Sequence, residues 1–303
     1  LLGITFAALL ITQQSSIFVG LMSRTYAFVD DTNLPDLWIT DPEVQYIDEL
    51  EPMQDTALDR VRGVPGVAWA VPMFKAVLRG RLPSGTFRSM IVVGIDDATL
   101  IGGPPRMIEG SLADLRQADG VILDEISART RLARYSAYDA DGRPAEGAER
   151  IPMQVGDTLQ INDQRAVVVG LCEVSRTFQS QPVVYTTFSR ALSYAPPERK
   201  QTSLILAAAA DGIDPEQLAR TVTASTQLRA RTRDQMAWDT VLYYLRNTGI
   251  PINFGIAVLL GFLVGVAIAG QTFYNFTLDN LRYFGALKAM GGGNWLLLRM
   301  VLL

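Results

Sequence analysis

The sequence predicts a membrane protein in which α-helical transmembrane spans flank a large α+β extracytoplasmic domain. Residues 250–274 are strongly apolar and carry no charge, and a helix needs about 20 such residues to cross a bilayer core. Residues 1–23 are also uncharged, so that Arg24 is the first charged residue of the chain. Residues 24–246 lie between these stretches and are numerous enough to form one large or two small globular domains.

The pattern predicts six consecutive segments. We expect a first transmembrane helix at 1–23, an α+β domain at 24–235, a stalk helix at 236–249, a second transmembrane helix at 250–276, a surface helix at 277–293 and the start of a third transmembrane helix at 294–303. The first span has no initiator Met and no basic segment before it, unlike a signal peptide. We therefore expect both terminal spans to be truncated. Loop 279–293 has two basic residues and one acidic residue, which favours the cytoplasm for this loop.

Local patterns predict both strands and helices in the large domain. Strands are expected at 37–40, 182–186 and 203–207, and hairpins at 74–82 with 87–95 and at 158–161 with 165–171, because β-forming residues are joined there by turn residues. Helices are expected at 54–62, at 125–133, after Asp214-Pro215 and at 234–246. The polar segment 139–149 is expected to be a solvated loop. Together these elements predict the α+β class.

Composition excludes several kinds of chemistry. The chain has no His, which removes Ser-His-Asp triads, Cys-His pairs and HExxH zinc sites. No GxxxxGK[ST] loop is present, so nucleotide hydrolysis would need another chain or a missing part of this one. Adjacent carboxylates such as Asp96-Asp97 point to opposite faces of a strand, and segment 139–149 does not match a calcium loop. We therefore expect no catalytic residue, cofactor or metal site, and no enzymatic activity.

Charge limits the partners. Of the 27 basic and 31 acidic residues, only Asp279, Arg282, Lys288 and Arg299 lie outside 24–246, which leaves that region 24 basic and 30 acidic residues and a net charge of −6. A nucleic-acid partner is not expected, because phosphate binding needs a basic face. Cys172 is the only cysteine, and a buried apolar role is favoured for it over that of a reactive thiol.

Small residues recur along the second span. Ala257, Gly261, Gly265 and Ala269 are spaced by four residues, so they form one stripe on a helix. Such a stripe lets a second helix approach closely within the membrane lipid. We expect this stripe to pack against another helix of the bundle or of a second copy.

The segment after the second span predicts an amphipathic surface helix. Its apolar residues fall near helical spacing, whereas the charged residues project elsewhere, and a glycine suits the end of the helix. The apolar positions are Leu278, Leu281, Phe284 and Leu287; the charged ones are Asp279, Arg282 and Lys288; the glycine is Gly291. A plain connecting loop would not need an apolar face, so we expect a helix that docks a soluble partner.

The segment Asn280-Leu-Arg-Tyr-Phe-Gly-Ala-Leu-Lys-Ala-Met-Gly291 resembles the cytoplasmic coupling segment of FtsX/MacB-type ABC transporter permeases. Its ending, from Leu287 to Gly291, is most similar to that of the DevC-like exporters. Residues 109–125 and 155–170 resemble the periplasmic core domain of the same family, so the resemblance extends over essentially the whole chain. Tyr283 departs from the pattern, because many relatives carry an acidic residue there.

The resemblance implies an architecture and a set of partners. Residues 24–235 would be a periplasmic core domain, and 277–293 a cytoplasmic coupling helix on which a separate ABC ATPase docks through the segment from Leu278 to Lys288. Phe284 and Leu287 would be apolar anchors and Arg282 and Lys288 charged contacts. The protein would be a homodimeric, multi-pass permease of the bacterial inner membrane. A periplasmic membrane-fusion adaptor and an outer-membrane channel would complete a tripartite efflux system.

Other functions stay open at this point. Some relatives of this type release lipoproteins or regulate cell-wall hydrolases. A sensory receptor with an extracytoplasmic ligand domain is an alternative from another class, but it would need a cytoplasmic signalling helix after the second span. The return to apolar sequence at residue 295 counts against that alternative.

Overall fold

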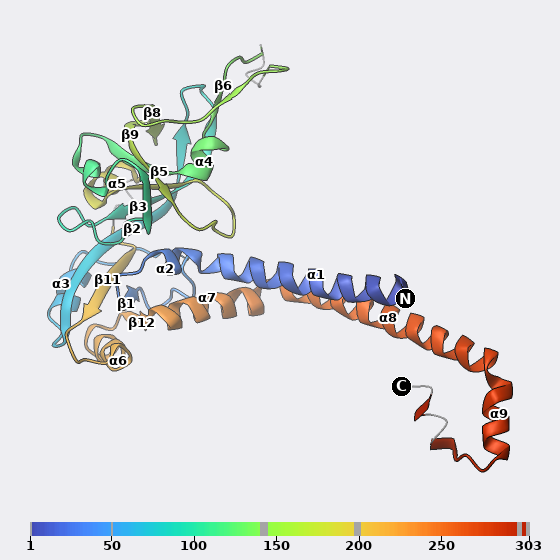
Figure 1. Ribbon diagram of the computed structural model, residues 1–303. Coiled ribbons are helices and arrows are strands. Elements are labelled where there is room, and N and C mark those ends of the chain that lie inside the picture. The colour runs from blue at the N-terminus through green and yellow to red at the C-terminus, as the bar shows by residue number, and fades with distance from the viewer. Residues whose placement is uncertain (1, 50, 140–144, 197–200, 296–298, 301–303) are drawn as a thin grey trace. The chain divides into compact units, whose positions relative to one another are not determined.

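The computed structural model describes residues 2–49, 51–139, 145–196, 201–295 and 299–300 (Figure 1). The chain divides into two compact units. The globular unit is Met22–Arg246, and the helical unit consists of Leu1–Leu21 with Asn247–Leu303.

The globular unit is built on strands that form one continuous path of pairing. The strands are β1 (Leu37–Thr40), β2 (Val67–Arg81), β3 (Phe87–Ile95), β4 (Arg106–Glu109), β5 (Gly120–Asp124), β8 (Thr158–Ile161), β9 (Gln164–Glu173), β10 (Val183–Thr187), β11 (Leu204–Ala209) and β12 (Arg229–Thr232), with β6 (Arg134–Tyr135) and β7 (Arg150–Ile151) in a separate small hairpin. Their order is β12-β1-β11-β2-β3-β10-β5-β9-β4, and β8 pairs with β2 and β9. Most pairs are antiparallel, whereas β10 with β3 and β5 with β9 are parallel.

Strand β2 joins two lobes because its two halves have different partners. Residues 67–73 pair with β11, and residues 74–81 pair with β3. The first lobe therefore contains β12, β1, β11 and the first half of β2, with α3 (Ala57–Arg62) and α6 (Pro215–Thr226) packed on it. The second lobe contains the other strands of the path, with η1 (Leu112–Arg116), α4 (Glu125–Arg129) and α5 (Phe188–Tyr194). A displacement of β2 is thus shared by both lobes.

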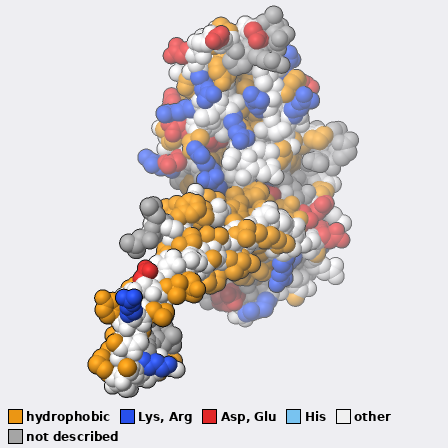
Figure 2. Space-filling view, turned by 90° about the vertical axis from the view of Figure 1, so that its right-hand side faces the viewer, with side chains coloured by type: hydrophobic (Ala, Val, Ile, Leu, Met, Phe, Trp, Pro, Cys, Tyr) orange, Lys and Arg blue, Asp and Glu red, His pale blue; other side chains and the backbone are white. Residues whose placement is uncertain are grey.

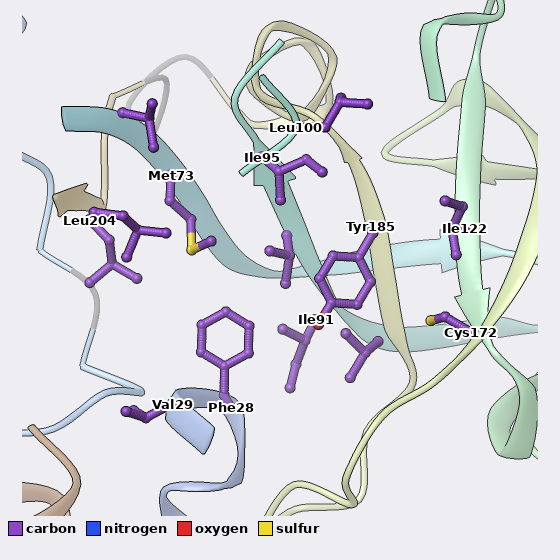
Figure 3. Close-up of a cluster of buried hydrophobic side chains, with 14 of the residues drawn as sticks. Phe28, Val29, Met73, Ile91, Ile95, Leu100, Ile122, Cys172, Tyr185 and Leu204 are labelled. Carbon is purple, nitrogen blue, oxygen red and sulfur yellow. The ribbon is translucent and has the colours of Figure 1, made fainter. Parts of the chain in front are cut away.

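Each lobe has its own apolar core, and a third cluster connects them. The first core includes Ile39 and Val222, and the second includes Phe74 and Val184. The connecting cluster contains residues of both lobes and of α2 (Ala27–Asp31). Figure 3 shows Phe28 of α2 pointing into this cluster, toward Met73 and Ile91. Burial of these side chains is the main stabilising contribution, and it includes α2 in the folded domain.

Turn and cap residues explain several boundaries. Asn162 and Asp163 both have positive φ, 46° and 64°, which is the backbone of a two-residue type I′ hairpin turn between β8 and β9. At the start of α6 the Asp214 side chain accepts a hydrogen bond from the backbone N–H of Gln217, and Pro215 occupies the first turn. The carboxylate satisfies one of the open N–H groups of the helix start, and proline has no N–H that would need a partner.

Some predicted elements differ from the observed ones. The helix expected at 54–62 begins at Ala57, and the helix expected at 125–133 ends at Arg129. Strand β12 and helix α5 were not expected, because β12 contains two arginines and α5 has only seven residues. Within the predicted loop 139–149, residues 140–144 lie outside the described part of the chain.

The helical unit contains two long apolar helices. They are α1 (Leu2–Thr25) and α8 (Ile250–Asp279), and α8 is followed by α9 (Leu281–Ala289). Residues Gly3–Thr25 and Ile250–Asp279 are long and apolar enough to cross a membrane. Figure 2 shows hydrophobic side chains over much of the visible surface of this unit. Of the predicted third span, 294–303, residues 296–298 and 301–303 lie outside the described residues.

Candidate functional site: the junction and the α8–α9 turn

The segments that connect the globular unit to the apolar helices leave from neighbouring strands. Helix α2 follows α1 and leads into β1, whereas β12 leads directly into α7 (Arg233–Asn247). Strands β1 and β12 are antiparallel, and Leu37 at the start of β1 lies opposite Thr232 at the end of β12. Both connections therefore meet at one edge of the first lobe. We call α2, residues 41–49, β12, α7 and residues 174–181 the junction.

Helix α2 is fastened to two other parts of the junction. The guanidinium of Arg233, at the start of α7, lies 3.1 Å from Oδ1 of Asp30 in α2. The Asp31 carboxylate accepts hydrogen bonds from the backbone N–H and the hydroxyl of Ser175, at 2.7 and 2.8 Å. Burial raises the pKa of Asp31, and the two hydrogen bonds from Ser175 oppose that shift. Helix α2 is therefore linked both to α7 and to the loop that follows β9.

A buried arginine fixes residues 41–49 against β12. The guanidinium of Arg231 donates to Oγ1 of Thr40 at 2.8 Å and to the carbonyl oxygen of Val44 at 2.9 Å. The Asp239 carboxylate of α7 lies between Arg231, at 3.4 Å, and Arg229, at 2.9 Å. Burial, followed by the charge of Arg229, lowers the pKa of Arg231 to about 10. The guanidinium is still cationic at neutral pH, so its hydrogen bonds persist there.

Residues 41–49 also contact α7 and the centre of β2. The backbone N–H of Ile47 donates to Oγ1 of Thr240 at 3.2 Å, and Nζ of Lys75 donates to the carbonyl oxygen of Ile47 at 3.1 Å. Lys75 is buried, forms an ion pair with Asp48 and lies 4.6 Å from the centre of the Phe28 ring. Because β2 changes partners between residues 73 and 74, Lys75 connects the junction to the strand shared by both lobes.

Aromatic rings complete the junction. Tyr46 stacks on Tyr243 with ring centres 3.9 Å apart, and Tyr244 meets Phe178 at 4.8 Å. Burial raises the pKa of Tyr46 to about 12 and raises that of Tyr244 as well, so both phenols are neutral. The rings join residues 41–49, α7 and the loop 174–181 through apolar contacts that are independent of salt and pH.

The chemistry of the junction is that of a rigid connection. Its ion pairs, such as Arg229 with Asp239 and Arg233 with Asp30, hold its segments together, and within the described ranges no cluster of three or more His, Cys, Asp or Glu residues could hold a metal ion. A displacement of α2 or α7 would be carried through these contacts to β1, β2 and the loop before β10. The junction therefore links α2 and α7 to both lobes.

The predicted partner-docking residues lie on both sides of a helix break. Leu278 and Asp279 belong to the last turn of α8, and the surface helix begins at Leu281. Asn280 separates the two helices because its conformation, with φ of −102° and ψ of 10°, is not helical. The segment from Leu278 to Lys288 is therefore not one continuous amphipathic helix, and Leu278 does not share a helix face with Leu281.

Exposure divides the predicted residues of α9 into two groups. Leu281, Arg282 and Lys288 are exposed, whereas Phe284 and Leu287 are half-buried on one face. The ring of Phe284 meets that of Phe276 in α8 at 6.5 Å in an edge-on arrangement. The exposed group is directly available to a partner, whereas Phe284 contributes to holding α9 against α8.

Helix α9 ends in a glycine motif. Gly291 has a φ of +98°, the backbone N–H of Gly292 donates to the carbonyl oxygen of Leu287, and that of Gly291 donates to Lys288. These two bonds define a Schellman motif, which requires a left-handed residue at the position of Gly291. The sequence prediction that Gly291 ends the helix therefore has a specific physical basis.

The stripe of small residues lies where α1 approaches α8. A Cβ atom added to Gly265 would lie 3.0 Å from Cβ of Ala7, and one added to Gly261 would lie 3.3 Å from Ile11. Ala257 and Ala269 are half-buried on the same face, and Gly261 is the buried residue of α8. Within this chain the partner of the stripe is thus the first apolar helix.

These features define a class of protein in which a two-lobed α+β domain is inserted between two apolar helices. The domain contacts both connecting segments, α2 and α7. A family model described as the MacB-like periplasmic core domain matches residues 1–225. The chain belongs to this family, and it is a MacB/FtsX-type ABC permease. Comparison with curated proteins finds no match.

Two extracytoplasmic domains are among the solved structures to which this chain is similar. The chain is similar to the periplasmic region of MacB from Actinobacillus actinomycetemcomitans, with 13% identity, a TM-score of 0.44 and coverage of 73% of this chain and 96% of that one. It is also similar to the extracellular domain of the noncanonic ABC-type transporter YknZ from Gram-positive bacteria, with 10% identity, a TM-score of 0.40 and coverage of 65% and 98%.

Family membership settles the coarse function. A permease of an ABC-type transporter works with an ATPase, so an ATPase partner is implied. The family and the two apolar helices together indicate a protein of the inner membrane. Sequence patterns did not identify the junction residues Asp48, Lys75, Arg231 and Asp239, because their partners lie on other elements that only the fold brings together. The two arginines of β12 are the one sequence signal that could have revealed the junction, since a strand rarely buries a charge without a partner.

Proposed function

We propose that this chain is the permease subunit of an ABC-type exporter and that it transmits ATP-driven movement to its periplasmic domain. ATP hydrolysis would occur in a separate cytoplasmic ATPase, and the chain itself would not be an enzyme. The observation that carries the proposal is the continuity of the chain: α7 is fastened into the domain, α8 begins three residues after it, and the exposed helix α9 follows α8.

Each segment would have one physical role. The ATPase would dock on α9 through exposed Leu281, Arg282 and Lys288, and Leu278 and Asp279 at the end of α8 would add to this surface. Phe284 and Leu287 would keep α9 packed so that its movement displaces α8. Helix α8 would then pull on α7, and the junction would pass the displacement to both lobes through Arg231 and Lys75.

We further propose the assembly in which this happens. The permease would be a homodimer in a multi-pass arrangement, and a periplasmic membrane-fusion adaptor and an outer-membrane channel would make it part of a tripartite efflux system. The DevC-like ending from Leu287 to Gly291 supports this subtype. Co-purification of the full-length protein in mild detergent tests the assembly. Recovery of an adaptor supports efflux, whereas recovery of a lipoprotein without an adaptor would contradict it.

Charge reversal on α9 tests the docking surface. We expect Arg282→Glu with Lys288→Glu to lower the stimulation of the ATPase by the reconstituted full-length permease about tenfold, which corresponds to roughly 1.4 kcal/mol of lost interaction. The matched control is Arg88→Glu with Arg220→Glu, which makes the same change in net charge at two exposed positions of the globular unit. Equal stimulation by both double variants and the unchanged protein would show that α9 is not the docking surface.

A further inference from the structure

A polar cleft lies between α4 and the loop that follows β9. The cleft has a volume of about 310 Å³, which is at the lower end of the range of small-molecule sites. Figure 1 shows this loop, which follows β9 along the chain, near α4. The cleft is lined by two arginines and by five serine or threonine residues, and Val174 and Val183 are among its apolar residues. The cleft belongs entirely to the globular unit and is separate from α9.

Two arginines at this cleft have no counter-charge. Neither Arg131 nor Arg176 forms an ion pair or a hydrogen bond with any residue in the described part of the chain. Nearby arginines behave differently: Arg129 pairs with Glu125 at 2.5 Å, and Arg106 pairs with Glu173 at 2.9 Å. In a region with a net charge of −6, two unpaired guanidiniums on one cleft form a local site of positive charge.

The acidic group at the cleft forms no ion pair with either arginine. Asp124 is the only acidic residue in the wall, and its carboxylate accepts hydrogen bonds from the backbone N–H groups of Ser127 and Val183, at 2.7 and 3.0 Å. The carboxylate is buried, and its oxygens are hydrogen-bonded to backbone N–H groups. The two guanidiniums, which have five donors each, are thus available to an anion.

Three of the five hydroxyl groups at the cleft also lack partners among the described residues. The side chains of Ser127 and Ser180 make no hydrogen bond with the residues that the structure describes, and Oγ1 of Thr177 is buried without one. A buried polar atom without a partner is unfavourable, so a ligand that supplies a partner to Oγ1 of Thr177 would be favoured. These groups match a ligand that carries hydroxyls next to its anionic group.

We propose that this cleft binds a small hydroxylated anion, of the class of a polyol phosphate. The arginines bind the phosphate oxygens through charge-assisted hydrogen bonds, and the serine and threonine hydroxyls bind the polyol. Both a free metabolite and the headgroup of an anionic phospholipid have this chemistry. The loop that forms one wall also bonds to α2 through Ser175 and contacts α7 through Phe178, so the ligand lies against the junction.

Calorimetry with glycerol 3-phosphate tests the site in full-length protein held in phosphatidylcholine nanodiscs. We expect saturable binding that is tighter than that of inorganic phosphate, and no binding of glycerol. Arg131→Gln with Arg176→Gln should weaken it by roughly tenfold or more. The control, Arg106→Gln with Arg129→Gln, removes the same charge from paired arginines and should change affinity less than about twofold. Absence of saturable binding, or an equal loss in the control, would overturn the proposal.

Two further arms sharpen the result. Thr177→Val should reduce affinity without lowering the melting temperature, because it removes a hydroxyl that has no partner in the fold; unchanged affinity would exclude Thr177 from the site. Nanodiscs that contain phosphatidylglycerol identify the source of the ligand. Competition with glycerol 3-phosphate would show that the headgroup enters the cleft, and its absence would show that the site takes the free metabolite.

Discussion

The two units of this protein place the same apolar residue types in opposite surroundings. In the globular unit Leu206 is completely buried, whereas in the helical unit Leu260 exposes 56% of its surface. Phe262, Leu263 and Val266 are exposed as well, on a helix that contains no charge before Asp279. An exposed apolar surface of this extent is a liability in water, but it is the normal surface of a helix in lipid. The difference shows that the two units are adapted to different solvents.

The units also differ in how they are held together. The globular unit combines three apolar clusters with buried ion pairs and long-range hydrogen bonds. The described part of the helical unit relies on close packing at glycines and on contacts between rings, such as Phe18 with Phe254 at 5.4 Å. Helix packing in lipid depends on close approach because burial of apolar surface brings no gain there. Each of the following substitutions tests one side of this contrast.

The largest effect is expected in the core of the globular unit. Leu206→Ala should lower the free energy of unfolding by about 2–5 kcal/mol, because it leaves a cavity in a packed cluster. Leu260→Ala should change the same quantity by less than about 0.5 kcal/mol, because that side chain is exposed and lies in the other unit. Guanidinium unfolding in detergent measures both, followed by tryptophan fluorescence, to which Trp38 and Trp69 of the globular unit contribute. Similar losses in the two variants would contradict the assignment of Leu260 to a lipid-facing surface.

A smaller effect is expected where α1 approaches α8. Gly265→Leu should separate the two helices at a cost of about 1–3 kcal/mol, because its Cβ position is already 3.0 Å from Ala7. Gly270→Leu is the matched control, since nothing lies within 4 Å of that position. The yield of bismaleimide cross-linking in a protein with Phe18→Cys and Phe254→Cys reports the contact. A drop with Gly265→Leu alone is expected; equal yields in both would show that the helices do not pack through Gly265.

The smallest of the three effects is expected at the junction. Asp48→Asn should leave the buried Lys75 cation without its carboxylate and cost roughly 1–2 kcal/mol, less than the penalty at fully buried pairs, because Asp48 is 35% exposed. Asp59 is the matched control: its side chain is 82% exposed and lies 3.9 Å from the guanidinium of Arg62. Asp59→Asn should lower the free energy of unfolding by less than about 0.5 kcal/mol. Thermal unfolding in detergent compares them. An equal change in melting temperature would mean that Lys75 does not depend on Asp48.

The sequence allowed prediction of features that depend on neighbouring residues. The apolar run from 250, the hairpin with a turn at 83–86, the cap Asp214 and the stop at Gly291 all follow from local chemistry, and the structure contains each of them. The α+β class of the domain and the family were predicted as well, and the family match confirms them.

Long-range features were not predictable in this way. Arg231 is buried in β12 only because Thr40 and Val44, more than 180 residues away, accept its hydrogen bonds. Likewise, Thr240 accepts from Ile47 across 193 residues. The two arginines of β12 are therefore the only local signal of the junction, and its contacts emerge only in the folded chain. The break at Asn280 was missed because the apolar spacing continues through it.

Hydrogen exchange at the junction tests the central claim most directly. The claim is that an ATPase bound at α9 moves the globular unit through α7 and its contacts. In the reconstituted complex, addition of a non-hydrolysable ATP analogue should change the exchange of the amides of Ile47 and of β12, and this change should disappear with Arg282→Glu and Lys288→Glu. Identical exchange with and without nucleotide in the unchanged complex, at full occupancy of the ATPase, would contradict the claim.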